Sequence, residues 1–315
     1  MTRPAPPDDE QIRALLRAAC PGSRLLRAWP LTGATGSQVT AIETVRPDGR
    51  RQVLVLRQYG EANLRADPHA ADTEARLLRL LLAAGLPVPR PYLADESGSI
   101  VPGPWLLQDY IDGDRIDDPA DLADFTGQLA AVLARLHDIS VTTVDAPFLA
   151  PLSDGVALRM GTAVPGAGGF GNEPAIRAAL RASWPPPAAN RPAVLHGDYW
   201  PGNVLWRDGT LVGVVDWEDA AFGDPLADLA ITRLEVGWFH GAAAMDLLTR
   251  QYQELRPHAD LSALPLWDLQ AALRACAFPL PDWGLPEDQV AAMRAAHGDF
   301  AADALSRLLP DEDEP

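Results

Sequence analysis

Residues 196–203 read His-Gly-Asp-Tyr-Trp-Pro-Gly-Asn, and Asp-Trp-Glu follows at residues 216–218. Transfer of a phosphoryl group needs a carboxylate that orients and deprotonates the acceptor, together with oxygen ligands for a magnesium ion. Asp198 fits the first role, and Asn203 and Asp216 fit the second. A single Asp or Asn in a loop more often caps or turns the backbone. The order and spacing of all three indicate phosphoryl-transfer chemistry.

The residues between these motifs predict a β-hairpin. Residues 204–206 resemble a strand, Asp208-Gly209 is a tight-turn pair, and residues 211–215 read as a buried strand. We therefore expect Asn203 and Asp216 at adjacent ends of one hairpin, where both side chains would reach the same metal ion.

The motifs at 196–203 and 214–218, and the run Gly-Asp-Pro-Leu-Ala-Asp-Leu-Ala at 223–230, resemble those of the aminoglycoside phosphotransferase family. The family consists of protein-kinase-like enzymes that act on small molecules, and the likeness extends over most of the chain. The resemblance implies that Asp198 is the catalytic base and that Asn203 and Asp216 bind magnesium.

The same resemblance assigns supporting roles to two further residues. His196 would organise the backbone of the catalytic loop, and Asp228 would steady that loop by hydrogen bonds. Trp217 and Glu218 depart from the Asp-Phe-Gly form of protein kinases, though not from the small-molecule branch.

A loop of small residues at 31–37 is a candidate phosphate-binding segment. It lies between two strand-like runs, and backbone amides in such a loop approach phosphates without hindrance from side chains. We assign Gly33, Gly36 and Ser37 to nucleotide binding. An ordinary hairpin turn is the alternative interpretation.

All 26 basic residues are arginine, so the lysine with which protein kinases hold the α- and β-phosphates is absent. Residues 51–57 read as a strand, and the resemblance places Arg57 where that lysine is expected. A guanidinium differs from an ammonium group in reach and geometry. By the resemblance, Arg57 pairs with Glu74, in a helix predicted to begin at Asp67-Pro68 with Asp67 as its cap. The alternative for Glu74 is a solvated carboxylate.

Residues 92–94 and 105–110 read as paired strands, the second of which leads into an interlobe hinge. In kinase-like folds adenine bonds to backbone groups of the hinge. The resemblance therefore points to Gln108, Asp109 and Tyr110 as nucleotide-binding residues.

The composition fits a soluble enzyme with 315 residues, 47% hydrophobic content and a net charge of -17. That charge repels nucleic acids and anionic membranes, no apolar run reaches transmembrane length, and no signal-peptide core is visible. We therefore expect a cytoplasmic protein with neither nucleic-acid nor membrane partners, and make no prediction of its oligomeric state. Cys20 and Cys276 are predicted to be buried thiols.

The carboxyl half is predicted to be helical and to select the acceptor. It includes a central helix over residues 122–136 that ends near a structural His137, and an irregular insertion around one short helix at 151–192. Glu218 and Asp219 are candidates to bind a cationic acceptor, or else turn caps. Trp238 would add an apolar or cation-binding wall, or else belong to the core.

We thus predict an α+β, protein-kinase-like fold with an antiparallel-sheet lobe at residues 1–109 and a mainly helical lobe at 110–315. ATP or GTP and magnesium would bind between the lobes, and the γ-phosphoryl group would pass to a hydroxyl of a small molecule, an aminoglycoside-like antibiotic or a metabolite.

Two alternatives to this small-molecule kinase remain open. The missing lysine suggests a nucleotide-binding pseudokinase with an interaction role. A metal-dependent hydrolase would use His196, Asp198, Asp216 and His137, but it needs a further ligand motif that the sequence does not show.

Overall fold

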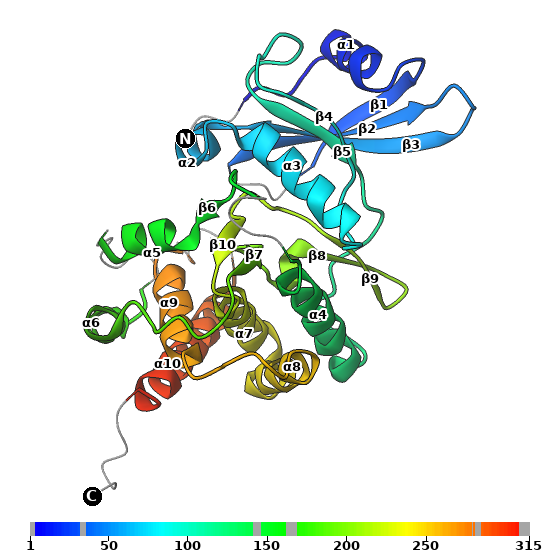
Figure 1. Cartoon of the computed structure of the whole chain (residues 1–315). Helices are drawn as coiled ribbons and strands as arrows, with labels where there is room; N and C mark the ends of the chain where they lie inside the picture. Colours follow the sequence, from blue (N-terminus) through cyan, green and yellow to red (C-terminus); the bar gives the residue numbers. More distant parts are fainter. Residues whose placement is uncertain are drawn as a thin grey trace, which may run out of the picture. The chain divides into compact units, whose positions relative to one another are not determined.

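The computed structural model describes residues 4–31, 36–140, 146–161, 169–278, 280 and 285–308. The chain divides into two compact units (Figure 1). Unit 1 comprises the residues up to Asp114 together with Leu205–Arg207 and Val212–Glu218, and unit 2 comprises the remainder. Unit 1 is built on an antiparallel sheet and unit 2 is mainly helical, which confirms the predicted α+β fold.

The sheet of unit 1 has five strands, and each strand is antiparallel to its neighbours. Their spatial order is β1 (Arg24–Pro30), β2 (Ser37–Val45), β3 (Arg51–Tyr59), β5 (Trp105–Asp109) and β4 (Pro91–Asp95). The helices of the unit are α1 (Asp9–Ala19), α2 (Glu61–Ala66) and α3 (Ala70–Ala83). The strands predicted at 51–57, 92–94 and 105–110 are all present.

The two faces of β3 carry different residues, and this alternation decides where Arg57 lies. Leu54 and Leu56 are buried in the apolar core that α1 completes with Ile12, Leu15 and Leu16. Because successive side chains of a strand point to opposite faces, Arg57 belongs to the other face. There α3 supplies a buried carboxylate to pair with it. The sheet therefore separates an apolar layer from a charged one.

The start of α3 differs from the prediction. Asp67 is the C-cap of α2 and has an extended backbone, and α3 begins at Ala70 without a side-chain cap. Pro68 explains the difference, because a proline disfavours the helical conformation of the residue before it. Asp67 instead accepts a hydrogen bond of 2.8 Å from the backbone N–H of His69.

The predicted hairpin is present as β8 (Val204–Arg207) and β9 (Thr210–Val214). Its turn residues Asp208 and Gly209 have φ angles of 51° and 75°. Positive φ at both central positions is the pattern of a type I′ turn, whose twist matches that of two antiparallel strands.

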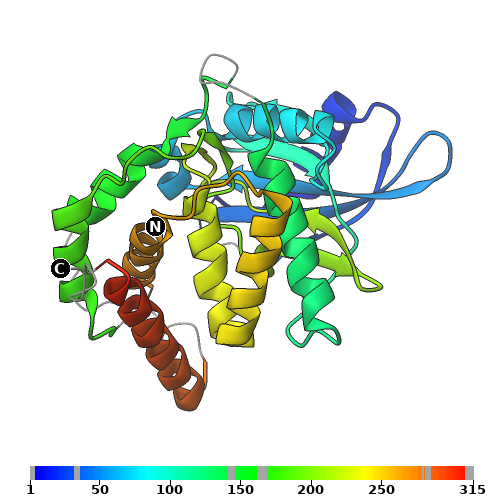
Figure 2. The same ribbon diagram turned by 60° about the horizontal axis from the view of Figure 1, so that its bottom comes forward.

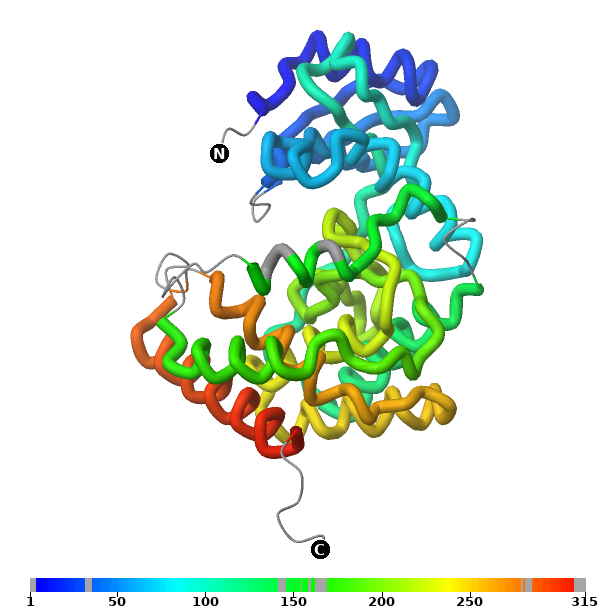
Figure 3. The backbone as a smooth tube through the Cα atoms, turned by 60° about the vertical axis from the view of Figure 1, so that its left-hand side comes forward, coloured from blue at the N-terminus to red at the C-terminus, as the bar shows by residue number. Residues whose placement is uncertain are grey.

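Unit 2 is organised around α7, which is buried along most of its length. Helix α8 packs against both α4 and α7, as Figure 2 shows, and α9 lies against α6 and α10 (Figure 3). The helices are α4 (Leu122–His137), α5 (Leu152–Gly161), α6 (Glu173–Ser183), α7 (Leu226–His240), α8 (Ala242–Leu255), α9 (Leu264–Ala275) and α10 (Glu287–Ser306).

A small sheet and a short 3-10 turn complete the described part of unit 2. Strand β10 (Ala221–Gly223) lies between β6 (Ala150–Pro151), to which it is parallel, and β7 (Ala193–Leu195), to which it is antiparallel. The 3-10 turn η1 covers Pro201–Asn203.

The segment at 151–192 contains two helices, so the prediction of an irregular insertion with one short helix is wrong. Glycine and proline lie mainly between and after these helices, while α6 itself is rich in alanine, leucine and arginine. Pro174 occupies the first turn of α6, where the missing N–H costs no hydrogen bond.

The two cysteines are free thiols. Cys276 is buried as predicted, whereas Cys20 is half-buried, and burial raises the pKa of both. Within the described ranges, no helix combines the length and the apolar character that crossing a bilayer requires.

The core of unit 1 yields a test of packing. We expect Leu54→Ala to lower the free energy of unfolding by about 2 to 5 kcal/mol, because it leaves a cavity beneath α1. Leu255→Ala is the matched control, since Leu255 is 50% exposed and Leu54 is fully buried. Urea denaturation followed by tryptophan fluorescence measures both, and equal effects would contradict the assignment of this core.

Candidate active site

The loop that carries the sequence motif begins where β7 ends, in unit 2. Gly197 has a φ of +79°, and a Cβ atom added there would lie 2.0 Å from the backbone oxygen of Asp219. Only glycine tolerates both the conformation and this close approach. The motif glycine therefore permits tight packing of the loop against the residue that follows Asp-Trp-Glu.

The buried carboxylate of Asp228, in the first turn of α7, fixes this loop. It accepts hydrogen bonds from the backbone N–H groups of His196, at 2.7 Å, and Gly197, at 2.9 Å. The ring nitrogen Nδ1 of His196 in turn lies 3.2 Å from the backbone nitrogen of Asp198, which donates to it. The contacts that the resemblance implies for Asp228 and His196 are thus present.

Behind Asp228 lies His137, which the structure places in a buried network, as predicted. Its Nε2 is 3.4 Å from Asp228 Oδ2 and its Nδ1 is 2.8 Å from the hydroxyl of Tyr252. Burial lowers the pKa of His137, so the neutral ring donates to Asp228 and accepts from Tyr252. Burial alone would raise the pKa of Asp228, but its hydrogen bonds to His137 and His196 hold that pKa below its usual value.

Asp198 is held by its own loop through Asn203. The Asn203 Nδ2 group donates to the Asp198 backbone oxygen, at 2.9 Å, and to its carboxylate Oδ2, at 3.0 Å. These bonds engage the nitrogen end of the amide, and no described residue donates to its oxygen. The Asp198 side chain is 26% exposed, which leaves part of the carboxylate accessible.

Two further groups lie near Asp198 that no sequence motif indicated. Arg274 of α9 places Nη2 2.8 Å from Asp198 Oδ1 and 3.2 Å from Asp219 Oδ2. Glu235 of α7 is buried, and burial together with the negative charge of Asp198 raises its pKa to about 8. No local pattern marks either residue, because helix packing alone brings them to the loop.

In unit 1, Arg57 is the centre of a second charged cluster. Its side chain is 7% exposed, and its guanidinium lies 3.7 Å from Glu74 Oε1 and 2.7 Å from Asp216 Oδ1. It also pairs with Glu218 and donates from Nε to the Ser37 hydroxyl at 3.2 Å. Burial opposes the charge, but the surrounding carboxylates raise the pKa of Arg57 well above its usual value.

The predicted pairing of Arg57 with Glu74 is therefore present. Glu74 is a buried residue rather than a solvated one, and the hydroxyl of Tyr59 donates to its Oε2 at 2.7 Å. The second oxygen of the carboxylate thus also has a partner, as a buried charge requires.

Asp216 follows β9 with a φ of 68°, in the left-handed region that residues other than glycine seldom occupy. Such backbone conformations concentrate at functional sites, where the surrounding structure maintains them. Asp216 uses one carboxylate oxygen towards Arg57, and no described residue donates to the other.

The carboxylates of Glu218 and Asp219 are already engaged. Glu218 pairs with Arg57 and accepts a hydrogen bond of 2.7 Å from Asn63 Nδ2, whereas Asp219 pairs with Arg274. Each therefore binds a guanidinium of its own unit, and a cationic acceptor would have to compete with that arginine for the carboxylate.

The remaining nucleotide-binding candidates lie along the sheet of unit 1. Gly36 and Ser37 lead into β2, where a Cβ on Gly36 would lie 3.0 Å from Asn63 Oδ1, and Gly33 lies outside the described residues. Gln108 and Tyr110 lie at the end of β5. The Tyr110 N–H donates to the Val53 carbonyl at 3.3 Å, so this backbone donor is already engaged.

Trp238 lies in an aromatic cluster of unit 2. Its ring is parallel to that of Phe170, with centroids 6.2 Å apart, and the rings of Phe278 and His297 lie within 6.5 Å. It is half-buried, so packing accounts for this side chain as well as a role in acceptor binding does.

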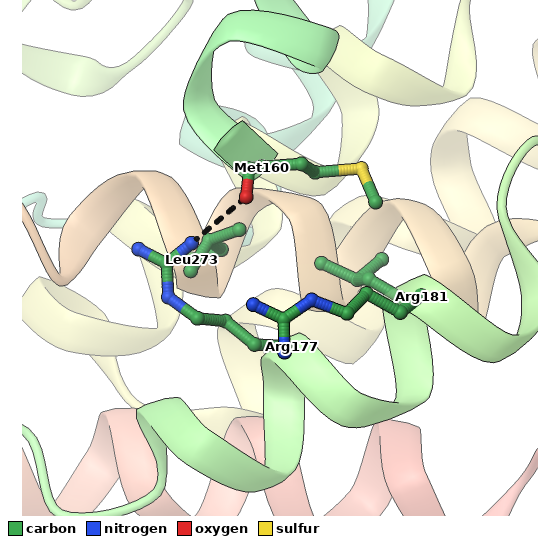
Figure 4. A pocket seen from close by; sticks show the side chains of 5 residues that line it. Met160, Arg177, Arg181 and Leu273 are labelled. Atoms are coloured by element: carbon green, nitrogen blue, oxygen red, sulfur yellow. Dashed lines mark hydrogen bonds between the residues drawn. The ribbon is translucent and has the colours of Figure 1, made fainter. Parts of the chain in front are cut away.

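A shallow depression in unit 2 is distinct from these clusters. Figure 4 shows it between Met160, Arg177, Arg181 and Leu273, and it encloses about 140 Å³, part of which is open solvent. Ligand pockets usually hold about 300 to 1,000 Å³, so this depression is too small for a nucleotide. In the part of the chain that the structure describes, no three His, Cys, Asp or Glu side chains form a group that could hold a metal ion.

The sequence matches known phosphotransferases over most of its length. Residues 43–262 match the model of the phosphotransferase enzyme family APH. A homoserine kinase of Rhodospirillum rubrum is 31% identical over 233 residues, which cover 66% of this chain and 68% of that kinase. Acyl-CoA dehydrogenase family member 10 of Mus musculus is 28% identical over 196 residues, which cover 58% of this chain. The chain spans only 18% of the length of that relative.

The fold agrees with this match. A thermostable mutant of the aminoglycoside phosphotransferase APH(4)-Ia, in a ternary complex with AMP-PNP and hygromycin B, superposes with a TM-score of 0.63 at 17% identity. The superposition covers 93% of this chain and 98% of that one. A family match that includes the Asp198 loop, the Arg57 cluster and the Asp228 network, on a shared kinase-like fold, leads to one conclusion. The chain belongs to the phosphotransferase enzyme family of small-molecule kinases.

Proposed function

We propose that the protein transfers the γ-phosphoryl group of ATP or GTP to a hydroxyl group of a small molecule, in a reaction that requires magnesium. One observation carries the proposal: a partly exposed aspartate is held in a loop whose backbone is fixed by a second, buried aspartate. Support comes from the homoserine kinase relative and from the APH(4)-Ia complex with AMP-PNP and hygromycin B.

Asp198 is the proposed general base. Each carboxylate oxygen has more than one lone-pair direction, so the bonds to Asn203 and Arg274 leave acceptor capacity for a substrate hydroxyl. A base must lie within hydrogen-bond reach of the proton that it takes, and a rigid loop keeps it at that position. The hydrogen bonds that Asp228 accepts from the backbone N–H groups of the loop supply this rigidity.

Arg57 is the proposed phosphate-holding residue. A guanidinium has five N–H donors and binds oxyanions with high geometric specificity. Glu74 fixes its position on the sheet, and Ser37 fixes its Nε atom. The backbone at Gly36 and Ser37 would contact the phosphates beside Arg57. The end of β5, at Gln108 and Tyr110, would contact the nucleobase.

The proposed magnesium ligands are Asn203 and Asp216. Both supply hard oxygen donors, the type that this ion prefers, and each retains an oxygen to which no described residue donates. A bound magnesium ion would neutralise the charge that develops on the phosphates.

A second candidate is a nucleotide-binding pseudokinase. The observation that favours it is the arginine at position 57, which is already bound by three carboxylates. The presence of Asp198, Asn203 and Asp216 favours the kinase.

We expect Asp198→Asn to reduce acceptor-stimulated phosphorylation by about 10²- to 10⁴-fold, the usual contribution of a general base. The measurement is turnover of ATP and GTP with magnesium, against aminoglycosides, macrolides, amino alcohols, hydroxy amino acids and sugars. Asp208→Asn in the hairpin turn is the control, because asparagine tolerates its positive φ.

An Asp198→Asn variant with the wild-type rate would eliminate Asp198 as the base. Nucleotide binding by the wild-type protein, with no turnover on any acceptor, would instead favour the pseudokinase.

We also expect Glu74→Gln to raise the KM for the nucleotide by about tenfold, equivalent to about 1.4 kcal/mol, because Arg57 loses its buried anchor. Steady-state kinetics at a saturating acceptor concentration measures the change. Glu61→Gln is the control, since Glu61 is an exposed residue that pairs only with Arg65 among the described residues. A KM equal to that of the wild type would refute the anchoring role.

A further inference from the structure

The guanidinium of Arg274 lies directly against the proposed base but comes from outside the family match. That match ends at residue 262, whereas Arg274 lies in the last turn of α9. Arg274 therefore lies outside the part of this chain that matches the family model.

Its contacts join two separate parts of unit 2. The same nitrogen, Nη2, lies 2.8 Å from Asp198 Oδ1 and 3.2 Å from Asp219 Oδ2. The side chain is 15% exposed, and the guanidinium carbon lies 5.7 Å from the centroid of the Phe278 ring. Arg274 thus bridges the motif loop and the residue that follows Asp-Trp-Glu.

The contact with Arg274 completes the set of interactions that hold the Asp198 carboxylate in place. Asn203 donates to Oδ2 while Arg274 binds Oδ1, so each oxygen has a partner from a different element. Two partners on opposite oxygens restrict rotation of the carboxylate about its bond to Cβ. Such restriction is what a catalytic group needs, since small errors in position cost large factors in rate.

Arg274 also offsets repulsion between like charges. Asp219 is its second partner, and the buried Glu235 is close enough to sense the charges of both Asp198 and Arg274. Burial and Asp198 raise the pKa of Glu235, while Arg274 acts in the opposite direction. Arg274 is thus the cation that the acidic side chains of Asp198, Asp219 and Glu235 share.

We propose that Arg274 is a positioning residue for phosphoryl transfer, which holds Asp198 in the orientation that receives the acceptor proton and is itself anchored by Asp219. The proposal rests on the proposed function. A single guanidinium nitrogen, Nη2, makes both carboxylate contacts, and the delocalised charge of an arginine suits a mostly buried position.

The first test is kinetic, with the acceptor from the panel that most stimulates wild-type turnover. Arg274→Gln should lower kcat at least about tenfold and leave the nucleotide KM unchanged, because only the orientation of the base is lost. Arg274→Lys should recover part of kcat, and Asp219→Asn should lower kcat less than Arg274→Gln. Arg250→Gln, at an exposed arginine of α8, is the control.

A wild-type kcat in Arg274→Gln, or a loss confined to the nucleotide KM, would overturn the proposal. So would equal loss in Arg274→Lys and Arg274→Gln when both variants retain the wild-type melting temperature, because the conservative change would then rescue nothing.

The second test does not depend on activity. The pKa of Glu235, which burial and the charge of Asp198 raise, is followed by NMR of ¹³C-labelled glutamate and assigned with Glu235→Gln. It should increase in Arg274→Gln and decrease in Asp198→Asn. An unchanged titration in Arg274→Gln would overturn the charge contact. If the wild-type protein phosphorylates no acceptor while Glu235 responds as expected, the proposed function fails and the charge cluster stands.

Discussion

The buried carboxylate of Asp228 is the constraint on which the motif loop depends. It binds two consecutive backbone N–H groups, those of His196 and Gly197, and each would cost about 1 to 3 kcal/mol if left buried without an acceptor. The carboxylate in turn needs its own hydrogen bonds, which His137 of α4 supplies with support from Tyr252 of α8. Three helices therefore meet at one carboxylate, and the geometry around Asp198 follows from that meeting.

Unit 1 depends on a comparable arrangement, in which a buried cation, Arg57, is surrounded by carboxylates. An arginine on a sheet face is costly to bury unless its charge is paired and its donors are satisfied. Glu74, Asp216 and Glu218 pair with Arg57, and Ser37 accepts from Nε. Because these partners come from α3, β2 and the segment after β9, the single cation links parts of the unit that are far apart in sequence. The segment that contains Asp216 is thus held to the sheet by Arg57.

The sequence predicted the elements in which local preferences agree with the final structure. The sheet strands alternate with period two, and Asp208-Gly209 supports a tight turn, so both were predictable. The ion pair of Arg57 with Glu74 and the contacts of Asp228 were inferred from motif resemblance. The prediction of an irregular segment at 151–192 was wrong because glycine and proline lie around two regular helices. The prediction of a helix start at Asp67 was wrong because Pro68 keeps the backbone of Asp67 extended.

The environment of Asp198 could not be predicted from local sequence. Arg274 and Glu235 lie on different helices, and only the packing of α7, α9 and the motif loop brings their side chains to Asp198. Glu218 and Asp219 appeared available to a ligand because the sequence does not show that arginines bind them. Charged side chains far apart in sequence thus define this site as much as its motif does.

The guanidinium at position 57 affects the pH range over which the charged cluster of unit 1 stays intact. A buried lysine readily loses its proton, so a site built on one weakens as the solution becomes alkaline. Arg57 remains charged throughout that range, and its carboxylate partners raise its pKa further. The cation that fixes the segment carrying Asp216 is therefore permanent, so this contact does not weaken as the solution becomes alkaline.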